Sequence, residues 1–366
     1  MEALFWISAG VILYVYGGYP LLLSAWARRA ARTLRKTGVD AGGPWPSISI
    51  VLAARNEAAR LPARVANLLE LTYPGRREII VVSDGSTDHT GDVLSSFGPN
   101  VRVIEVPAGG KPLALNAGVA RSTGEILVFA DARQHFSPAA LVEMVANFAD
   151  PQVGGVTGEL LLDCKGPDGA VSTIGEGVGL YWKYEKWLRR NESAVWSTLG
   201  ATGAIYALRR TLWRPLPADT LLDDVLAPMR AVLSGHRIVF EPRAQAFDRT
   251  SPDAVAESRR KTRTLAGNYQ ILAQEPRLLV PFVNPVWLRY VSHKVGRLLV
   301  PWALAAAFIS SGFLAAASWL HAVAFATQLG FYGLAAIGGI FDARERRATP
   351  PGTESLPVAL TSKGAR

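Results

Sequence analysis

The sequence predicts an α/β protein with a Rossmann-like, mostly parallel sheet, amphipathic helices at the membrane interface, and transmembrane helices at both ends. Two observations lead to this prediction. Strand-like and helix-like segments alternate from Ser47 to Phe148, and no charged residue occurs in 3–27 or 298–341. A chain of 366 residues is long enough for one large α/β domain beside these membrane segments.

Residues 1–27 are predicted to form the N-terminal transmembrane helix, because 25 uncharged residues can cross a hydrocarbon core of about 30 Å. A cleaved signal peptide is the alternative, suggested by Ala25-Trp26-Ala27. Residues 28–46 form a basic juxtamembrane linker with Arg28 and Arg29 at its start. By the positive-inside rule, the domain that follows lies in the cytoplasm.

The uncharged segment 298–341 is too long for one crossing, so we expect two transmembrane helices with a break at Ser318–His321. Residues 275–297, with Trp287, Tyr290 and several prolines, are expected to form an interfacial segment. Residues 342–366 are expected to be a disordered cytoplasmic tail. The whole chain would then be a multi-pass protein of the inner (plasma) membrane.

The net charge of +9 raises the possibility of nucleic-acid binding, but the basic residues crowd the membrane flanks and no aromatic-basic nucleic-acid motif occurs. We therefore expect no nucleic-acid partner, and favour membrane lipids or a diphosphate as partners of the positive charge. The single cysteine, Cys164, excludes an intramolecular disulfide and fits a reducing compartment.

Residues 47–274 form the predicted α/β domain. Its first half reads as four strands and four helices in alternation, with the strands at 47–53, 78–82, 101–106 and 125–130 and the helices at 56–71, 87–96, 111–120 and 138–148. Ligands of such sheets bind at the carboxyl ends of the strands. The polar clusters at Glu57, Asp84 and Asp131 each follow a strand, so we expect them to converge on one edge.

Two later helices carry both aromatic and basic residues. The segment from Gly175 to Asn191 interleaves tyrosines and tryptophans with lysines and arginines, which is typical of an amphipathic helix at the membrane surface. Packing of the same aromatics against the sheet is the alternative. In the basic segment 257–263, Arg260 and Arg263 share one helical face, suited either to a diphosphate or to anionic lipid.

Several of these residues have side chains suited to a nucleotide diphosphate. Asp84, on a Gly-containing turn, could accept hydrogen bonds from a base or ribose. Asp131 could hold a hard divalent cation that bridges a diphosphate. Lys111 follows a Gly-rich turn, and Lys111 and the Arg133 guanidinium could each pair with phosphate oxygens.

Taken together, these motifs resemble the family 2 glycosyltransferases with the GT-A fold, in particular the membrane-anchored branch related to cellulose, chitin and hyaluronan synthases. The resemblance covers Ser47 to about Arg297. It rests on seven clusters in the order of the family, at residues 53–57, 84–88, 110–116, 131–133, 202–206, 223–224 and 257–263.

The resemblance implies roles for individual residues. Asp224 would be the catalytic base, and Asp131 would bind the metal, Mg²⁺ or Mn²⁺. Asp223 would bind the acceptor together with Thr202 and Gly203. The nucleotide-sugar site would contain Ala53, Glu57, Asp84, Lys111, Asp131, Arg133, Arg260 and Arg263.

Two positions depart from the pattern of that family. The metal-binding Asp-x-Asp is here Asp131-Ala132-Arg133, so that one carboxylate of the pair is replaced by a guanidinium. The Gln-x-x-Arg-Trp motif of the polymer synthases reads Arg260-Lys261-Thr262-Arg263-Thr264, without the tryptophan that would stack on an acceptor sugar.

The resemblance therefore implies an inverting hexosyltransferase of polysaccharide biosynthesis that uses a UDP-sugar donor and a lipid-linked or growing glycan acceptor at the cytoplasmic face, with polysaccharide export proteins as further partners. Two alternatives remain open. The first is a polyprenyl-phosphate glycosyltransferase, and the second is a catalytically silent subunit of a polysaccharide export complex, which the altered metal and tryptophan motifs would suit.

Overall fold

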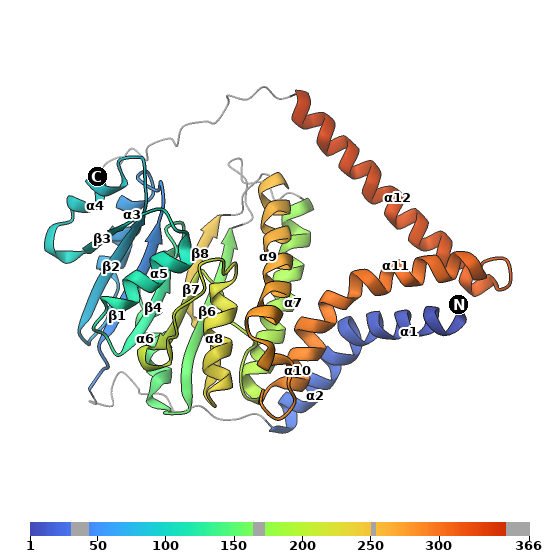
Figure 1. Ribbon diagram of the computed structural model, residues 1–366, viewed down its shortest axis with the longest axis horizontal. Helices are drawn as coiled ribbons and strands as arrows, with labels where there is room; N and C mark the ends of the chain where they lie inside the picture. The colour runs from blue at the N-terminus through green and yellow to red at the C-terminus, as the bar shows by residue number, and fades with distance from the viewer. Residues whose placement is uncertain (31–43, 164–172, 250–253, 349–366) are drawn as a thin grey trace, which may run out of the picture. The chain divides into compact units, whose positions relative to one another are not determined.

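The computed structural model describes residues 1–30, 44–163, 173–249 and 254–348 (Figure 1). The chain divides into two compact units. Of the described residues, those within 13–300 form the α/β unit, whereas residues 1–12 and 301–348 form a helical unit.

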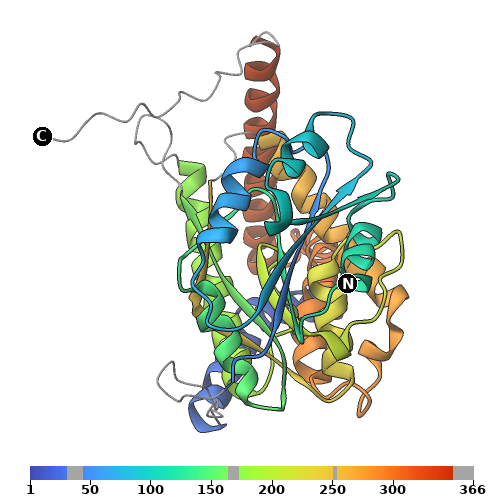
Figure 2. The same ribbon diagram turned by 90° about the vertical axis from the view of Figure 1, so that its left-hand side faces the viewer.

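An eight-stranded mixed sheet is the centre of the α/β unit (Figure 2). Its strand order is β3-β2-β1-β4-β7-β6-β8-β5. The strands are β1 (Ile48–Ala54), β2 (Arg77–Asp84), β3 (Arg102–Val106), β4 (Ile126–Ala130), β5 (His135–Phe136), β6 (Val153–Asp163), β7 (Ile205–Arg209) and β8 (Arg237–Arg249). Strands β1 to β4 are parallel, as predicted, and β7 runs antiparallel between β4 and β6.

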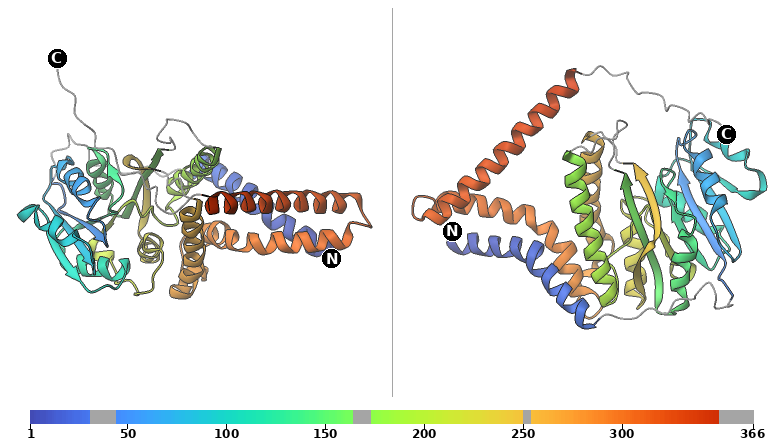
Figure 3. Two further views of the ribbon diagram at one scale, coloured as in Figure 1. Left: turned by 90° about the horizontal axis from the view of Figure 1, so that it is seen from above. Right: turned by 180° about the vertical axis from the view of Figure 1, so that it is seen from behind.

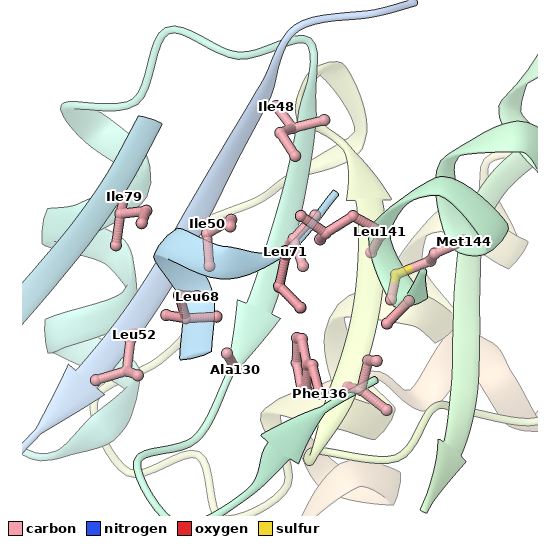
Figure 4. Packing of buried hydrophobic residues seen from close by; sticks show 14 of the residues in the cluster. Ile48, Ile50, Leu52, Leu68, Leu71, Ile79, Ala130, Phe136, Leu141 and Met144 are labelled. Atoms are coloured by element: carbon pink, nitrogen blue, oxygen red, sulfur yellow. The ribbon is translucent and has the colours of Figure 1, made fainter. Parts of the chain in front are cut away.

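The helices of this unit pack on both faces of the sheet. They are α3 (Leu61–Glu70), α4 (Thr90–Ser95), α5 (Lys111–Ala120), α6 (Ala140–Val145), α7 (Thr173–Val195), α8 (Asp223–Leu233) and α9 (Ala254–Gln274). Successive residues of β1 point to opposite faces, so Ile50 joins one hydrophobic cluster and Val51 the other. In the first cluster, Ile50 and Leu52 pack with Leu68 and Phe136 (Figure 4).

The predicted alternation is confirmed, although α6 begins two residues later than expected, and two other helices begin at least three residues later. Helix α3 starts at Leu61 instead of residue 56, because Asn56 has a φ of 54° and the backbone of this turn donates hydrogen bonds to side chains of the β2–α4 loop. Helix α4 likewise starts at Thr90 instead of residue 87. Because both helices start later, the loops at the carboxyl edge of the sheet are longer than predicted.

Three helices among the described residues are long and apolar enough to cross a membrane: Glu2–Ala30, Trp287–Leu314 and Trp319–Gly339. The first contains α1 (Glu2–Leu13), the π-helical η1 (Tyr14–Gly18) and α2 (Tyr19–Ala30), and the second contains α10 (Trp287–Tyr290), the π-helical η6 (Val291–Val295) and α11 (Gly296–Leu314). Figure 3 shows α11 joined by a short turn to α12 (Trp319–Ala348). This turn lies just before the predicted break.

Two predicted segments fall partly outside the described residues. Positions 31–43 of the predicted basic linker lie outside the described residues. Of the predicted tail, positions 349–366 lie outside them, whereas α12 continues as a helix to Ala348, past the expected end of the span at Phe341.

Helix α7 packs against α2 within the α/β unit. Leu188 and Val195 of α7 form a buried cluster with Tyr19, Leu23 and Ala27 of α2. The exposed face of α7 carries Tyr181 and Trp187. The helix is therefore amphipathic, as expected, but its apolar stripe covers a neighbouring helix, and the membrane-surface role stays a prediction for its outer aromatics.

A buried polar cluster joins α7 to the helices that continue into the candidate spans. The Glu192 carboxylate accepts a hydrogen bond from the Tyr19 hydroxyl at 2.9 Å and lies 2.7 Å from Nδ1 of His293. The Arg289 guanidinium donates to the carbonyl oxygens of Glu192 and Ser197, both at 3.0 Å. Glu192 therefore connects α2, α7 and η6 at one point.

We expect Glu192→Ala to destabilise the protein, because it leaves a buried hydroxyl and a buried imidazole without their shared partner. Breaking such a buried pair costs about 3 kcal/mol, which corresponds to a fall in Tm of roughly 6–12 °C for a domain of this size. Thermal unfolding in detergent measures this shift. Glu70→Ala, at an exposed position, is the matched control, and equal melting temperatures for both variants would contradict the expectation.

Candidate functional site

The carboxyl ends of β1, β2 and β4 place three of the predicted clusters along one edge of the sheet. In the parallel register Ala54 lies opposite Ser83, and Leu52 lies opposite Ala130. Glu57, Asp84 and Asp131 follow these strand ends. The convergence expected from the sequence is therefore present in the fold.

Asp84 connects the end of β2 to the loop before α5. Its buried carboxylate accepts hydrogen bonds from the backbone N–H groups of Gly109, at 2.7 Å, and Gly110, at 2.9 Å. Gly85, with a φ of 57°, permits this close approach, because a Cβ there would lie 2.5 Å from the backbone nitrogen of Ala108. Asp84 thus fixes the loop from which Lys111 extends, in addition to its predicted role toward the nucleotide.

The end of β1 is shaped by its own turn. Asn56 accepts a hydrogen bond from the Thr87 backbone N–H at 2.8 Å, which draws this turn toward the loop after β2. The Glu57 carboxylate is paired with Arg60 at 2.7 Å. Ala53 is half-buried and packs between two hydrophobic clusters. Of Ala53 and Glu57, the two predicted nucleotide-binding residues at this turn, Glu57 is the one with a polar side chain that could contact a nucleotide.

Lys111 stands at the centre of the site, at the first position of α5. Its ammonium lies 3.0 Å from Asp131 Oδ1 and 3.3 Å from Asp223 Oδ1. Burial disfavours the charged lysine, but Asp223 and Asp131 outweigh burial and hold the pKa of Lys111 above its usual range. The sequence assigned these three residues to one active site, but gave no sign that one lysine would bridge the two carboxylates.

Asp224 lies beside this centre, in the first turn of α8. Its Oδ2 accepts a hydrogen bond from the Gly203 backbone N–H at 2.8 Å. Burial, reinforced by the Asp223 carboxylate, raises the pKa of Asp224 to about 6. A carboxylate with that pKa is mostly ionised at neutral pH yet basic enough to accept a proton, as a general base must.

Gly203 and Thr202 belong to the turn that precedes β7. A Cβ at Gly203 would lie 3.0 Å from Asp224 Oδ2, so glycine lets the carboxylate approach the backbone. Thr202 is buried, and its backbone N–H donates to the Thr157 hydroxyl at 2.9 Å. Of the predicted acceptor-binding residues, Gly203 therefore contacts the candidate general base, Asp224, directly. Thr202 ties the turn to Thr157 of β6 through its backbone.

Arg133 pairs with a carboxylate of β8. Its guanidinium lies 3.8 Å from Asp248 Oδ2, and the Gln134 side chain donates to the same oxygen at 2.7 Å. The arginine is 42% exposed at its side chain, so it remains accessible to a phosphate. The sequence pointed to Arg133 but not to Asp248, which is far along the chain and lies in no recognisable motif.

The basic helix α9 lies beside the loop that enters α8. Arg263 donates to the Leu221 carbonyl at 3.1 Å, two residues before Asp223. A Cβ at Gly267 would lie 2.5 Å from Leu222 Cγ, so helix and loop are in close contact. Arg263 is therefore near the acidic turn, and the exposed Arg260 lies one helical turn earlier.

Two residues to which the sequence analysis assigns no role support Asp131 and Asp223. Arg64, a buried residue of α3, donates through Nε to the Asp131 carbonyl at 3.0 Å. The Tyr206 hydroxyl lies 3.4 Å from Asp223 Oδ2, and its ring stacks on Phe129 with a centroid distance of 4.6 Å. Both contacts are long-range, so no local pattern could have indicated them.

Asp131 is the predicted metal ligand. Within residues 1–30, 44–163, 173–249 and 254–348, no group of three or more His, Cys, Asp or Glu side chains is arranged to hold a metal ion. Mg²⁺, however, is commonly bound through one or two carboxylates together with substrate phosphates. Asp131 fits a metal of this kind, whose coordination a donor diphosphate would complete.

Comparison with known proteins places this site in a family. Residues 49–213 match the family described as Glycosyl transferase family 2. Probable glycosyltransferase YdaM of Bacillus subtilis is 26% identical over 240 residues, which cover 62% of this chain and 56% of that protein. Poly-beta-1,6-N-acetyl-D-glucosamine synthase of Staphylococcus epidermidis is 24% identical over 236 residues, with the same two coverages. The chain thus spans about half the length of these curated relatives.

A solved structure matches over nearly the whole chain. It is the mannosyltransferase PcManGT from Pyrobaculum calidifontis in complex with GDP-Man and Mn²⁺, with a TM-score of 0.69 and 25% identity. The match covers 90% of this chain and 92% of that one. Residues 49–213 therefore form a Glycosyl transferase family 2 domain, in a GT-A fold.

Proposed function

We propose that this protein is an inverting glycosyltransferase that moves a sugar from a UDP-sugar to a hydroxyl group of a lipid-linked or growing glycan at the cytoplasmic face of the membrane. The observation that carries the proposal is the arrangement of Lys111 and Asp224 around one acidic turn. Lys111 provides positive charge for a diphosphate, and Asp224 provides a base for an acceptor.

In the proposed reaction the acceptor hydroxyl oxygen attacks the anomeric carbon of the donor sugar. The hydroxyl proton goes to Asp224, whose Oδ2 is held by Gly203, so that Oδ1 takes the proton. The bond between the anomeric carbon and the diphosphate oxygen breaks, and its electron pair leaves with UDP. One displacement on the opposite side of the carbon inverts its configuration.

The leaving diphosphate needs positive charge. Lys111, held on its turn by Asp84, supplies a fixed ammonium, and Arg263 and Arg133 lie on flanking elements. A divalent ion bound at Asp131 would neutralise further charge on the diphosphate oxygens. The Lys111 ammonium is paired with two carboxylates. On donor binding it would either bind the diphosphate in addition to these carboxylates or leave them for the diphosphate.

The solved relative suggests a second candidate for the donor nucleotide. The family resemblance implies UDP, whereas PcManGT was solved with GDP-Man and matches 90% of this chain. A GDP-mannose donor is therefore the alternative. For the acceptor, Thr264 stands where the polymer synthases have tryptophan, and its hydroxyl bonds to the Arg260 carbonyl at 2.9 Å within the helix. This favours a single transfer over processive synthesis.

The orientation follows from the candidate spans and their charges. Arg28 and Arg29 end the first helix on the side of the α/β unit, and the positive-inside rule assigns that side to the cytoplasm. A membrane-embedded acceptor would then meet a cytoplasmic nucleotide sugar at the site.

The donor can be identified by measuring nucleotide release from a panel of UDP- and GDP-sugars with purified protein, Mg²⁺ or Mn²⁺ and membrane lipid extract. We expect release of UDP from one UDP-sugar in preference to all others. Release of GDP from GDP-mannose alone would replace the UDP proposal. Nucleotide binding without release from any donor would favour the silent-subunit alternative.

We expect Asp224→Asn to lower the rate of transfer by about 10²–10⁴-fold, because the amide cannot accept the acceptor proton. Donor binding, measured by calorimetry, should change little, since Asp224 faces the acceptor. Asp92→Asn, at an exposed carboxylate of α4, is the matched control and should retain full activity. Transfer by Asp224→Asn at the control rate would assign the base to another residue.

The pH dependence provides a separate test of the base. Because the pKa of Asp224 is about 6, we expect kcat/KM to fall as the pH drops below 6, where the carboxylate becomes protonated. Asp223 contributes to raising that pKa, so Asp223→Asn should move the acidic limb of the profile to lower pH. An acidic limb that stays at the same pH in this variant would mean that it reports another group.

A further inference from the structure

The loop between η5 (Pro276–Leu279) and α10 has an unusual surface. Leu279, Val280, Phe282 and Val283 are all exposed, and Leu288 in the first turn of α10 extends the same apolar surface. Phe282 is 103% exposed, so its entire ring lies outside the protein. We call residues 279–283 the apolar loop.

The apolar loop is held in a defined shape by its neighbours. The buried Asn284 side chain donates to the Leu278 carbonyl at 2.8 Å and accepts from the Val286 backbone N–H at 3.0 Å. The Trp287 indole N–H donates to the Leu279 carbonyl at 2.8 Å. These three side-chain hydrogen bonds close the loop on itself without using any of its exposed apolar side chains.

The backbone of Phe282 is in an unfavourable conformation. Its φ is 67°, in the left-handed region that residues with large side chains rarely adopt. Strain of this kind persists where the surrounding structure enforces it, and it concentrates at functional positions. Here the strain turns an aromatic ring away from the core, which is the opposite of what the hydrophobic effect favours in water.

The aromatic residues that first suggested an interfacial segment are not the ones on this surface. Tyr290 is 2% exposed and, with Leu278 and Val286, belongs to the core beneath α8. Trp287 is tied to the loop by its indole N–H. Within the segment that the sequence suggested, the residue available for an external contact is therefore Phe282.

The adjoining helix indicates what could cover this surface. Helix Trp287–Leu314 has 28 residues, which at about 1.5 Å per residue gives roughly 42 Å. The hydrocarbon core is about 30 Å thick, and the headgroup regions extend it to about 40–45 Å. A helix that spans this whole thickness has its Trp287 end among the headgroups, and the apolar loop comes directly before it. Arg277, exposed on η5, adds a positive charge suited to anionic headgroups.

We propose that the apolar loop, with Phe282 at its tip, inserts into the lipid boundary between headgroups and acyl chains, on the side of the membrane that faces the α/β unit. Insertion removes the exposed ring from water and docks the unit on the lipid surface beside the helix that starts at Trp287. The occupant of this surface is lipid, so a protein partner or a second copy of the chain is excluded by the proposal.

The experiment places an environment-sensitive fluorophore on a cysteine at position 282. Cys164 is the single cysteine of the chain, so Cys164→Ser gives a background for Phe282→Cys, and Leu288→Cys gives a second reporter on the same surface. Asn100→Cys, at an exposed position on η2 (Gly98–Asn100) far along the chain, is the matched control. The full-length labelled proteins are reconstituted into vesicles of phosphatidylcholine and phosphatidylglycerol.

We expect the emission of the reporters at 282 and 288 to be blue-shifted, and to lose intensity when the vesicles contain lipids with a nitroxide on the headgroup or at the top of the acyl chain. The control at 100 should show neither effect. Emission like that of the control at both positions would overturn the proposal. A blue shift without quenching by nitroxide lipids would also overturn it, because the loop would then be covered by protein. Neither readout depends on catalysis or on the identity of the donor.

Discussion

The pairing of Lys111 with Asp131 and Asp223 is the interaction on which the arrangement of the site depends. It brings together the first turn of α5, the end of β4 and the first turn of α8. A lysine is stable in this half-buried position because two carboxylates offset the loss of hydration, and each carboxylate is stable for the same reason. The loop held by Asp84 delivers the lysine, and the turn at Gly203 fixes the neighbouring Asp224.

This pairing also separates the roles of the two adjacent aspartates. Asp223 is buried and lies next to Lys111 and Tyr206. Its negative charge therefore mainly stabilises the Lys111 ammonium. Asp224 receives a backbone hydrogen bond and has its pKa raised to about 6 by burial and by Asp223. Two neighbouring carboxylates at a helix N-terminus thus have different partners, because Asp223 is in ion-pair contact with the ammonium and Asp224 with the Gly203 backbone N–H.

The parts of the fold that could be predicted from sequence are those set by local pattern. Strands β1, β2 and β4 contain runs of at least four apolar residues, and helix α5 begins at Lys111 as predicted. The later start of α3 was missed, because it depends on Asn56 and its contact with Thr87 across the loops. The sequence places several of the motif residues at the carboxyl ends of strands, but the Lys111 bridge and the Asp248 contact depend on tertiary packing that no spacing in the sequence encodes.

In the proposed reaction, the same ion pair would link donor binding to the pKa of Asp224. Lys111 lowers the pKa of Asp224 in the arrangement described, while burial and Asp223 raise it. A donor diphosphate that draws the ammonium toward its own oxygens weakens the influence of Lys111 on the carboxylates, so the pKa of Asp224 rises and its ability to accept a proton increases. A metal held at Asp131 would act in the opposite direction, since its positive charge would favour the ionised carboxylate. In the proposed reaction, the balance between these two cations would therefore determine how strongly donor binding activates Asp224 as the general base.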